Sequence, residues 1–227
     1  MPRNLLASLT IARVVAAATA APVPKEVLVP QLDRLFGKPD VGAGSCGFKL
    51  DGKKLVIAVP GTVEAPATKL AGAPRTKMEV TGDFEMEAIL WYKLPDKPAG
   101  AHAGAGFAVW QDDRRFALAN RHHWPAGDKW AGGYDVHYEH PEGKSVSHGS
   151  TCGENGPETP VRLRLRRQND TVTTSESRDG GKTWNKLTES ELKLPAAVNV
   201  GVVAFNSLKA GMEVHCESLT VTPLGKK

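Results

Sequence analysis

Apolar and polar residues alternate with a period of two along most of this chain, the pattern of half-buried β-strands. In residues 83–93, apolar side chains occupy every second position from Phe84 to Leu90. Residues 161–168 alternate apolar residues with arginines in the same way. No segment keeps an apolar period of 3.6 residues, so any helix is expected to be short. Further strands are expected at Phe48–Leu50, Lys54–Val59, Gly104–Gln111, Phe116–Arg121, Tyr134–Glu139, Thr171–Ser177, Asn199–Phe205 and Met212–Val221.

Turn signals separate the expected strands. Asp51-Gly52 lies between two of them and is typical of a tight β-hairpin. Asn169-Asp170 joins the arginine-bearing strand to the next one. About a dozen short strands with such turns predict one all-β domain, a sandwich of two antiparallel sheets, over residues 46–223. Residues 224–227 are expected to form a C-terminal tail.

The eight residues Ser177–Trp184 fit the spacing S-x-D-x-G-x-x-W, which resembles the Asp-box. Asp179 can accept hydrogen bonds from backbone N–H groups of its own turn. Gly180 and Gly181 can adopt the positive φ angles that a tight hairpin needs. We expect Trp184 to pack back over the strand pair. The motif indicates a β-hairpin, and it indicates no active site.

The first twenty residues have the pattern of an export signal. Arg3 precedes the apolar, Ala-rich segment Leu5–Ala20, whose last three residues form an A-x-A-like cleavage site. Arg13 interrupts this segment, and the alternative is a disordered N-terminus on a cytosolic protein. We expect residues 1–20 to be a signal peptide, the protein to be periplasmic or extracellular, and residues 21–45 to form an N-terminal tail.

The charge balance points away from nucleic acids and anionic membranes. The chain has 29 basic and 25 acidic residues, a formal net charge of +4. Without Arg3 and Arg13 of the leader the balance is 27 − 25 = +2, which is close to neutral. No later stretch approaches the roughly 20 apolar residues of a membrane-spanning helix.

Export would permit a disulfide, and the chain has three cysteines, Cys46, Cys152 and Cys216. Cys46 and Cys216 lie in the first and the last expected strand, which are often adjacent in sandwiches, so this pairing is favoured. A pairing through Cys152 stays open. The chain has no C-x-x-C, no phosphate loop and no G-x-S-x-G elbow, so we expect no cofactor.

Four segments carry a resemblance to a known family: Gly82–Glu87, Gly104–Asp113, Ser177–Trp184 and Val200–Phe205. Through them most of the chain, from Phe36 to Pro223, resembles the concanavalin A-like lectin/glucanase superfamily. The similarity is closest to small exported bacterial members of uncertain function, some labelled "regulation of enolase". This resemblance implies a jelly-roll sandwich, and its members bind glycans on a concave sheet face. Because the superfamily mixes binding modules with hydrolases, the resemblance implies no particular reaction.

Alternation also sorts side chains between the two faces of each strand. We take Phe107, Leu118 and Tyr134 as core residues, which fixes the facing of their strands. The outward residues then predict one face with small residues at its middle and polar or aromatic ones around them, suited to a shallow glycan groove. The alternative is an ordinary solvated sheet face. The residues placed outward are Gly106, Ala108, Trp110, Ala117, Ala119, Arg121, Asp135, His137, Glu139, Arg162, Arg164 and Arg166.

The loop 121–133 adds two tryptophans, Trp124 and Trp130, among glycines, a proline and His123. Flat aromatic rings with nearby polar groups suit the apolar faces of sugars. The alternative is that both rings fold back over a sheet edge. We therefore expect carbohydrate or polysaccharide as the ligand. The candidate binding residues are Trp91, Trp110, Arg121, His123, Trp124, Trp130, Asp135, His137 and Arg164.

Catalytic and metal-binding interpretations have less support. The chain lacks the strand pattern E-x-D-x-(x)-E of the related glucanases, so a non-catalytic module is favoured. One rival is a glycoside hydrolase whose acid pair lies among Glu85, Glu87, Asp135 and Glu139. Another is a structural or protein-interaction sandwich. The scattered histidines have no familiar ligand spacing, so no metal is expected. These histidines are His102, His122, His123, His137, His140 and His148.

Overall fold

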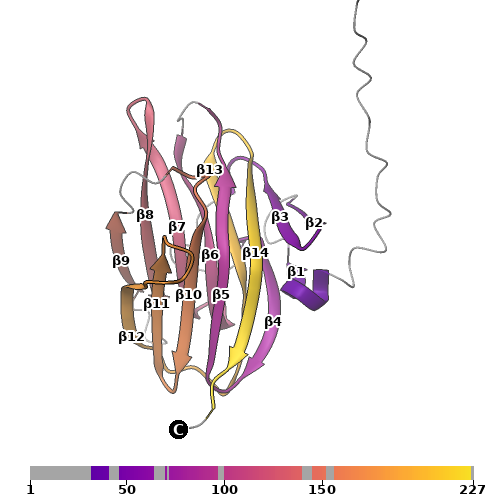
Figure 1. Cartoon of the computed structure of the whole chain (residues 1–227), viewed down its shortest axis with the longest axis vertical. Helices are drawn as coiled ribbons and strands as arrows, with labels where there is room; N and C mark the ends of the chain where they lie inside the picture. The colour runs from indigo at the N-terminus through magenta and orange to yellow at the C-terminus, as the bar shows by residue number, and fades with distance from the viewer. Residues whose placement is uncertain are drawn as a thin grey trace, which may run out of the picture.

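The structure, a computed structural model, describes residues 32–40, 46–63, 70, 72–96, 100–139, 145–151 and 156–225. Within these residues, two seven-stranded sheets lie face to face, and every strand pairs antiparallel to its neighbours (Figure 1). Sheet A has the order β1 (Lys38–Asp40), β4 (Arg75–Thr81), β13 (Ala197–Leu208), β6 (Gly100–Asp112), β7 (Arg115–Ala126), β8 (Lys129–Glu139) and β9 (Ser145–Thr151). Sheet B has the order β12 (Asn185–Glu191), β11 (Thr171–Ser177), β10 (Val161–Gln168), β5 (Phe84–Lys93), β14 (Met212–Pro223), β3 (Lys54–Val59) and β2 (Gly47–Asp51). The predicted all-β sandwich is confirmed.

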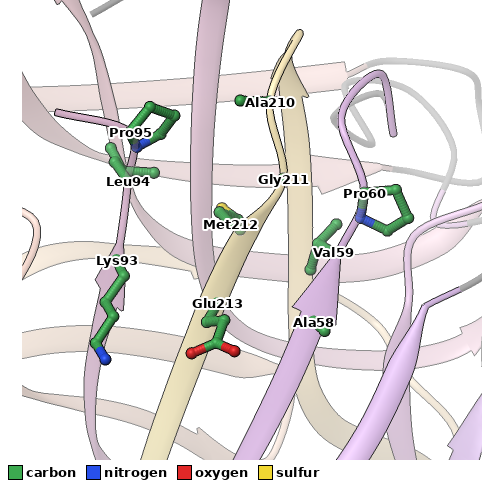
Figure 2. A pocket seen from close by; sticks show the side chains of 10 residues that line it. All are labelled: Ala58, Val59, Pro60, Lys93, Leu94, Pro95, Ala210, Gly211, Met212 and Glu213. Atoms are coloured by element: carbon green, nitrogen blue, oxygen red, sulfur yellow. The ribbon is translucent and has the colours of Figure 1, made fainter. Parts of the chain in front are cut away.

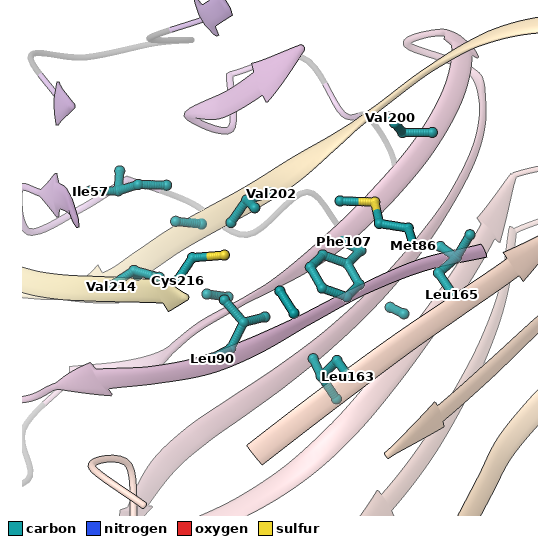
Figure 3. Packing of buried hydrophobic residues seen from close by; sticks show 14 of the residues in the cluster. Ile57, Met86, Leu90, Phe107, Leu163, Leu165, Val200, Val202, Val214 and Cys216 are labelled. Atoms are coloured by element: carbon teal, nitrogen blue, oxygen red, sulfur yellow. The ribbon is translucent and has the colours of Figure 1, made fainter. Parts of the chain in front are cut away.

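The end of β5, the start of β14 and the end of β3 lie side by side at one end of sheet B (Figure 2). Between the sheets, inward side chains from both layers form the main core (Figure 3). Phe107 and Val202 come from sheet A, and Met86, Leu163 and Val214 come from sheet B. Outward residues alternate with them, as the period of two predicts.

The facing predicted for β7 is wrong. Ala117 and Ala119 point into the main core, and Leu118 points to the outer surface of sheet A. Leu118 is nevertheless buried there, because a second apolar cluster covers that part of the outer surface. A strand buried on both faces shows no usable alternation, so its sequence does not reveal which face is inside. The facing predicted for Phe107 and Tyr134 is confirmed.

The expected turns form as predicted. Gly52 (φ 63°) and Asn169 (φ 54°) adopt left-handed backbone conformations in the hairpins β2–β3 and β10–β11. Asp179 accepts hydrogen bonds from the backbone N–H groups of Lys182 and Thr183, at 3.0 and 2.9 Å. These residues close the hairpin between β11 and β12.

Residues before the first expected strand also belong to the fold. Residues 32–36 form a helical turn, and β1 follows at the edge of sheet A. Leu32 and Phe36 are buried in the main core, so part of the expected tail belongs to the sandwich. The expected signal peptide lies outside the described residues. Among the described residues, no helix is long and apolar enough to cross a membrane.

The favoured disulfide does not form, because Cys46 and Cys216 are both free and buried. Cys46 immediately precedes β2, and Cys216 lies in β14. Strand β3 lies between these two strands, so the first and last strands of this sheet are not neighbours. Burial raises the pKa of both thiols, which disfavours the reactive thiolate. Cys152 lies outside the described residues.

Candidate functional site

The nine residues predicted for one binding face lie in several different places. Trp110, Trp124 and Asp135 are on the outer face of sheet A. Trp91 and Arg164 are on the outer face of sheet B, on the opposite side of the sandwich. The other four are Arg121, His123, Trp130 and His137, and the side chain of His137 lies outside the described part of the structure.

Arg121 and His123 are interior residues, contrary to the prediction that Arg121 points outward. Arg121 is fully buried and donates to the carbonyl oxygens of Thr159 and Gly156, each at 2.6 Å. The ring nitrogen Nδ1 of His123 lies 2.5 Å from the hydroxyl of Tyr92. The error at Arg121 follows from the reversed facing of β7. His123 was expected in a loop over residues 121–133, but β7 continues to Ala126 and β8 begins at Lys129, so the expected loop is mostly strand. These contacts fix the neighbouring segment and give Arg121 and His123 structural roles.

Trp130 matches the alternative considered for it, a ring folded back over the sandwich. It packs against the main core, and its indole N–H lies 3.3 Å from the carbonyl oxygen of Pro95. It also lines a pocket of about 390 Å³ with Pro157 and Thr159. Its principal contacts are therefore structural.

On the outer face of sheet B, Arg164 belongs to a network of ion pairs. Arg164 Nη2 lies 3.0 Å from Glu87, whose other oxygen contacts Arg162. The guanidinium carbon of Arg164 stands 3.6 Å from the centre of the Trp184 ring. Trp184 thus packs back over the sheet, as the Asp-box-like turn predicted. Charges paired in this way are typical of a wet sheet face.

Trp91, on the same face, is held in a stack. Its ring lies parallel to that of His215 at 3.8 Å between centroids. Its indole N–H points to Glu217 at 3.4 Å, and Glu217 pairs with Lys54 at 3.0 Å. Burial lowers the pKa of His215, which favours the neutral imidazole.

Trp110 lies at the end of sheet A's outer face that we call the covered end, defined by Ala108, Trp110, Phe116, Leu118 and Val203. Leu70 and Ala73, from the segment between β3 and β4, pack on it. Arg75 stacks over the Trp110 ring at 5.2 Å and pairs with Asp40 at 3.1 Å. Trp110 is only 4% exposed, so it offers no surface to a ligand.

The other end of the same face is polar and partly exposed. We call it the open end and define it by His102, Asn120, His122, Trp124 and Asp135. His122 Nδ1 lies 3.2 Å from an Asp135 carboxylate oxygen. The His122 and Trp124 rings lie 5.0 Å apart at an interplanar angle of 31°. The His102 ring lies 6.5 Å from that of His122.

Two glycines of β6 lie beside the open end. Gly104 pairs with His122 across the sheet, and Gly106 pairs with Asn120. A Cβ at Gly104 or Gly106 would overlap backbone oxygens of β7, so these two positions admit only glycine. Asn120 is 3% exposed, and its Oδ1 has no hydrogen-bond partner among the described residues. Gly104 and Gly106 are themselves buried, and the Phe205 ring lies against Gly104. The accessible part of the open end is therefore made by its partly exposed side chains, His102, His122, Trp124 and Asp135.

Sequence reasoning placed Trp124 and Asp135 in the candidate site but missed His102, Asn120 and His122. The signal was their spacing, because Asn120 and His122 share the facing of Trp124 at intervals of two residues. The wrong facing of Leu118 concealed it. Among the described residues, no group of His, Cys, Asp or Glu side chains is arranged to hold a metal ion.

Comparisons with known proteins bear on the fold. No protein-family model and no curated protein sequence matches the chain. Among solved structures, a functionally unknown protein from Saccharomyces cerevisiae is 15% identical and superposes with a TM-score of 0.66, covering 83% of this chain and 97% of its own. A legume lectin-like domain from Entamoeba histolytica is 10% identical with a TM-score of 0.53, covering 86% and 93%.

This chain has the concanavalin A-like lectin/glucanase fold. An alginate lyase from Klebsiella pneumoniae also has a similar structure, with 11% identity, a TM-score of 0.52 and coverage of 82% and 87%. Structures with the concanavalin A-like fold that resemble this chain therefore include both lectin-like and glycan-active proteins. At such low identities the likeness establishes the fold alone.

Proposed function

We propose that this protein binds carbohydrate without cleaving it, through the open end of sheet A's outer face. The observation that carries the proposal is the group of His122, Trp124 and Asp135, held in contact on the outer face of β7 and β8. A sugar ring needs a flat apolar platform for its C–H face and donors and acceptors for its hydroxyls. This group supplies both.

Each residue has a role in the proposed complex. The Trp124 indole stacks on the sugar ring, and the Asp135 carboxylate accepts hydrogen bonds from hydroxyls. Asn120 is buried beside this pair, and its Oδ1 lacks a partner within the described chain.

Two of the similar structures support the proposal by their names, a legume lectin-like domain and an alginate lyase. They show that the concanavalin A-like fold is used for glycan-related functions. The transfer of such a function to this chain rests on the open end itself.

The carboxylates argue against the hydrolase rival. Glycoside hydrolysis commonly uses two carboxyl groups about 5–10 Å apart, flanking the scissile bond. Glu85 and Glu87 are paired with arginines on sheet B, whereas Asp135 lies on the opposite side of the sandwich. Among the described side chains, Asp135 is the single carboxylate of the open end. The side chain of Glu139 lies outside the described part of the structure.

The test is a binding screen on the purified protein, run beside an assay for released reducing ends. The probes are soluble oligosaccharides of glucose, mannose, galactose or xylose, together with alginate oligosaccharides. We expect saturable binding of at least one probe and no release of reducing ends. Binding of no probe would overturn the proposal, and release that survives Trp124→Ala but not Glu87→Gln would replace it with the hydrolase.

We also propose that the protein is exported, on the pattern of residues 1–20. The mature N-terminus, sequenced from protein recovered from its host, is then expected at or near Ala21. A soluble cytosolic pool that retains Met1 would contradict export.

A further inference from the structure

A pocket unrelated to the open end lies on sheet B, where β5, β14 and β3 meet. Its volume is about 600 Å³, within the range of small-molecule sites. Apolar side chains form its walls, among them Pro60, Leu94, Pro95 and Met212. Figure 2 shows β14 running between the other two strands, with Lys93 and Glu213 at the end of the pocket away from Pro95.

From this arrangement we propose that the pocket binds a hydrophobic α-amino acid as a zwitterion. The apolar side chain of the ligand lies against Pro60, Leu94 and Pro95. Its α-carboxylate faces the ammonium of Lys93, and its α-ammonium faces the carboxylate of Glu213.

The strand register sets the spacing of the two charges. Lys93 and Glu213 are directly opposite each other on β5 and β14. Residues in such cross-strand pairs have Cα atoms about 4.5–5.5 Å apart, and their side chains leave the same face of the sheet. A cation and an anion thus stand next to each other on one face of the sheet, as the recognition of a zwitterion requires.

Neither Lys93 nor Glu213 forms a side-chain hydrogen bond or a close ion pair within the described chain. Glu213 lies 3.6 Å from His215 Nε2, which is too long for a hydrogen bond. Burial lowers the pKa of His215, which disfavours the imidazolium that would pair with Glu213. For Lys93, no carboxylate of the described residues lies within ion-pair distance.

The apolar part of the pocket is built before a ligand arrives. The rings of Pro60 and Pro95 restrict their own backbones. The Trp130 indole N–H donates to the carbonyl oxygen of Pro95 at 3.3 Å, which fixes the position of that wall. Gly211 and Ala58 leave space that larger side chains would fill. A preformed apolar wall reduces the ordering cost of binding.

The test is calorimetric titration of the full chain with L-phenylalanine and L-leucine at millimolar concentrations. Glycine lacks the apolar side chain, N-acetyl-L-phenylalanine lacks the ammonium, and L-phenylalaninamide lacks the carboxylate. We expect saturable binding of phenylalanine and leucine and none of glycine. Removing either charge of the ligand is expected to weaken binding about three- to tenfold.

Variants locate the site. Lys93→Gln and Glu213→Gln are each expected to weaken phenylalanine binding about three- to tenfold. Ala58→Leu, which fills the groove, is expected to abolish it. The matched controls Lys77→Gln and Glu79→Gln change exposed residues of β4 in the other sheet and should bind as the unaltered protein does. Absence of saturable binding, or equal affinity of the Lys93 and Glu213 variants and the unaltered protein, would overturn the proposal.

Discussion

The covered and the open end of sheet A's outer face are built by the same strands, yet they differ in accessibility. β6 and β7 carry Trp110 and Phe116 at one end and His102, His122 and Trp124 at the other. At the covered end, Leu70 and Ala73 pack on the aromatic rings. At the open end, the side chain of Asp135 stays 32% exposed. Residues from outside the sheet, here Leu70 and Ala73, and not the strand pattern, thus decide whether an outward tryptophan is core or surface.

The charged groups of the two ends also differ in what they contact. Arg75 is only 11% exposed and joins Leu70, Asp40 and Asp113 by one hydrogen bond and two ion pairs. Arg75 therefore holds the backbone at Leu70 against sheet A. At the open end, His122 is 13% exposed and contacts Asp135, which is 32% exposed. The Asp135 carboxylate is therefore the group of this pair that a ligand of the proposed kind would reach first.

The largest expected effect is that of Trp110→Ala at the covered end. Removal of a buried indole leaves a cavity, and such changes cost about 3–5 kcal/mol of unfolding free energy. Urea denaturation measures this loss. The folded fraction should bind glycan as the unaltered protein does, and a variant with normal stability and lost binding would show that Trp110 belongs to the site.

Arg75→Met tests whether Arg75 holds the backbone at Leu70 against sheet A. The variant loses ion pairs and a hydrogen bond but keeps part of the apolar contact with Trp110, so we expect a loss of roughly 1–2 kcal/mol. Lys77→Met, at an exposed position of the same strand, is the matched control and should be close to neutral. Equal stability of the two variants would contradict the role given to Arg75.

Trp124→Ala is expected to show the opposite of Trp110→Ala: weaker glycan binding with little change in stability. The ring is partly exposed, so stability should change little. Loss of a stacking platform is expected to weaken glycan binding by about 1–3 kcal/mol, or 5- to 150-fold. Titration of the variant and of Trp184→Ala, on the other sheet, measures the difference. Unfolding of the Trp124 variant would make this ring part of the core.

Asp179 provides a reference that is remote from both ends. Hydrogen bonds from Thr183 and Ser177 hold the pKa of the Asp179 carboxyl below its usual range. Because the folded pKa is lower than the unfolded one, the turn stabilises the protein at neutral pH and loses this contribution as pH falls below about 4. Asp179→Ala should lower the thermal midpoint at pH 7, with unchanged glycan binding. The difference from the unaltered protein should shrink at acid pH; a difference that persists there would contradict the assignment.

The sequence predicted those parts of the fold that depend on local chemistry. Alternation located the strands, and Gly52, Asn169 and Asp179 marked turns that form as expected. These signals need only near neighbours along the chain. The short turn at residues 32–36 and the strand β1 were missed, because their stability comes from Leu32 and Phe36 packing on distant strands.

The candidate site was harder to predict, because it depends on which face of each strand is covered. Leu118 is apolar and was assigned to the core between the sheets, but it is buried under Leu70 on the other face. That single reversal put Arg121 outside and left Asn120 and His122 unnoticed, whereas His123 was misplaced because β7 extends into the expected loop. Trp91 and Arg164 were joined to the same face because alternation gives the facing within a strand, not the sheet to which the strand belongs.

The most direct test of the account is to locate bound glycan by backbone amide NMR, with the oligosaccharide found in the screen. Binding at the open end predicts the largest shift changes at His102, Gly104, His122 and Asp135. Phe116 at the covered end and Arg164 on sheet B should change little. The largest changes at sheet B or at the covered end, with an unchanged open end, would contradict the account.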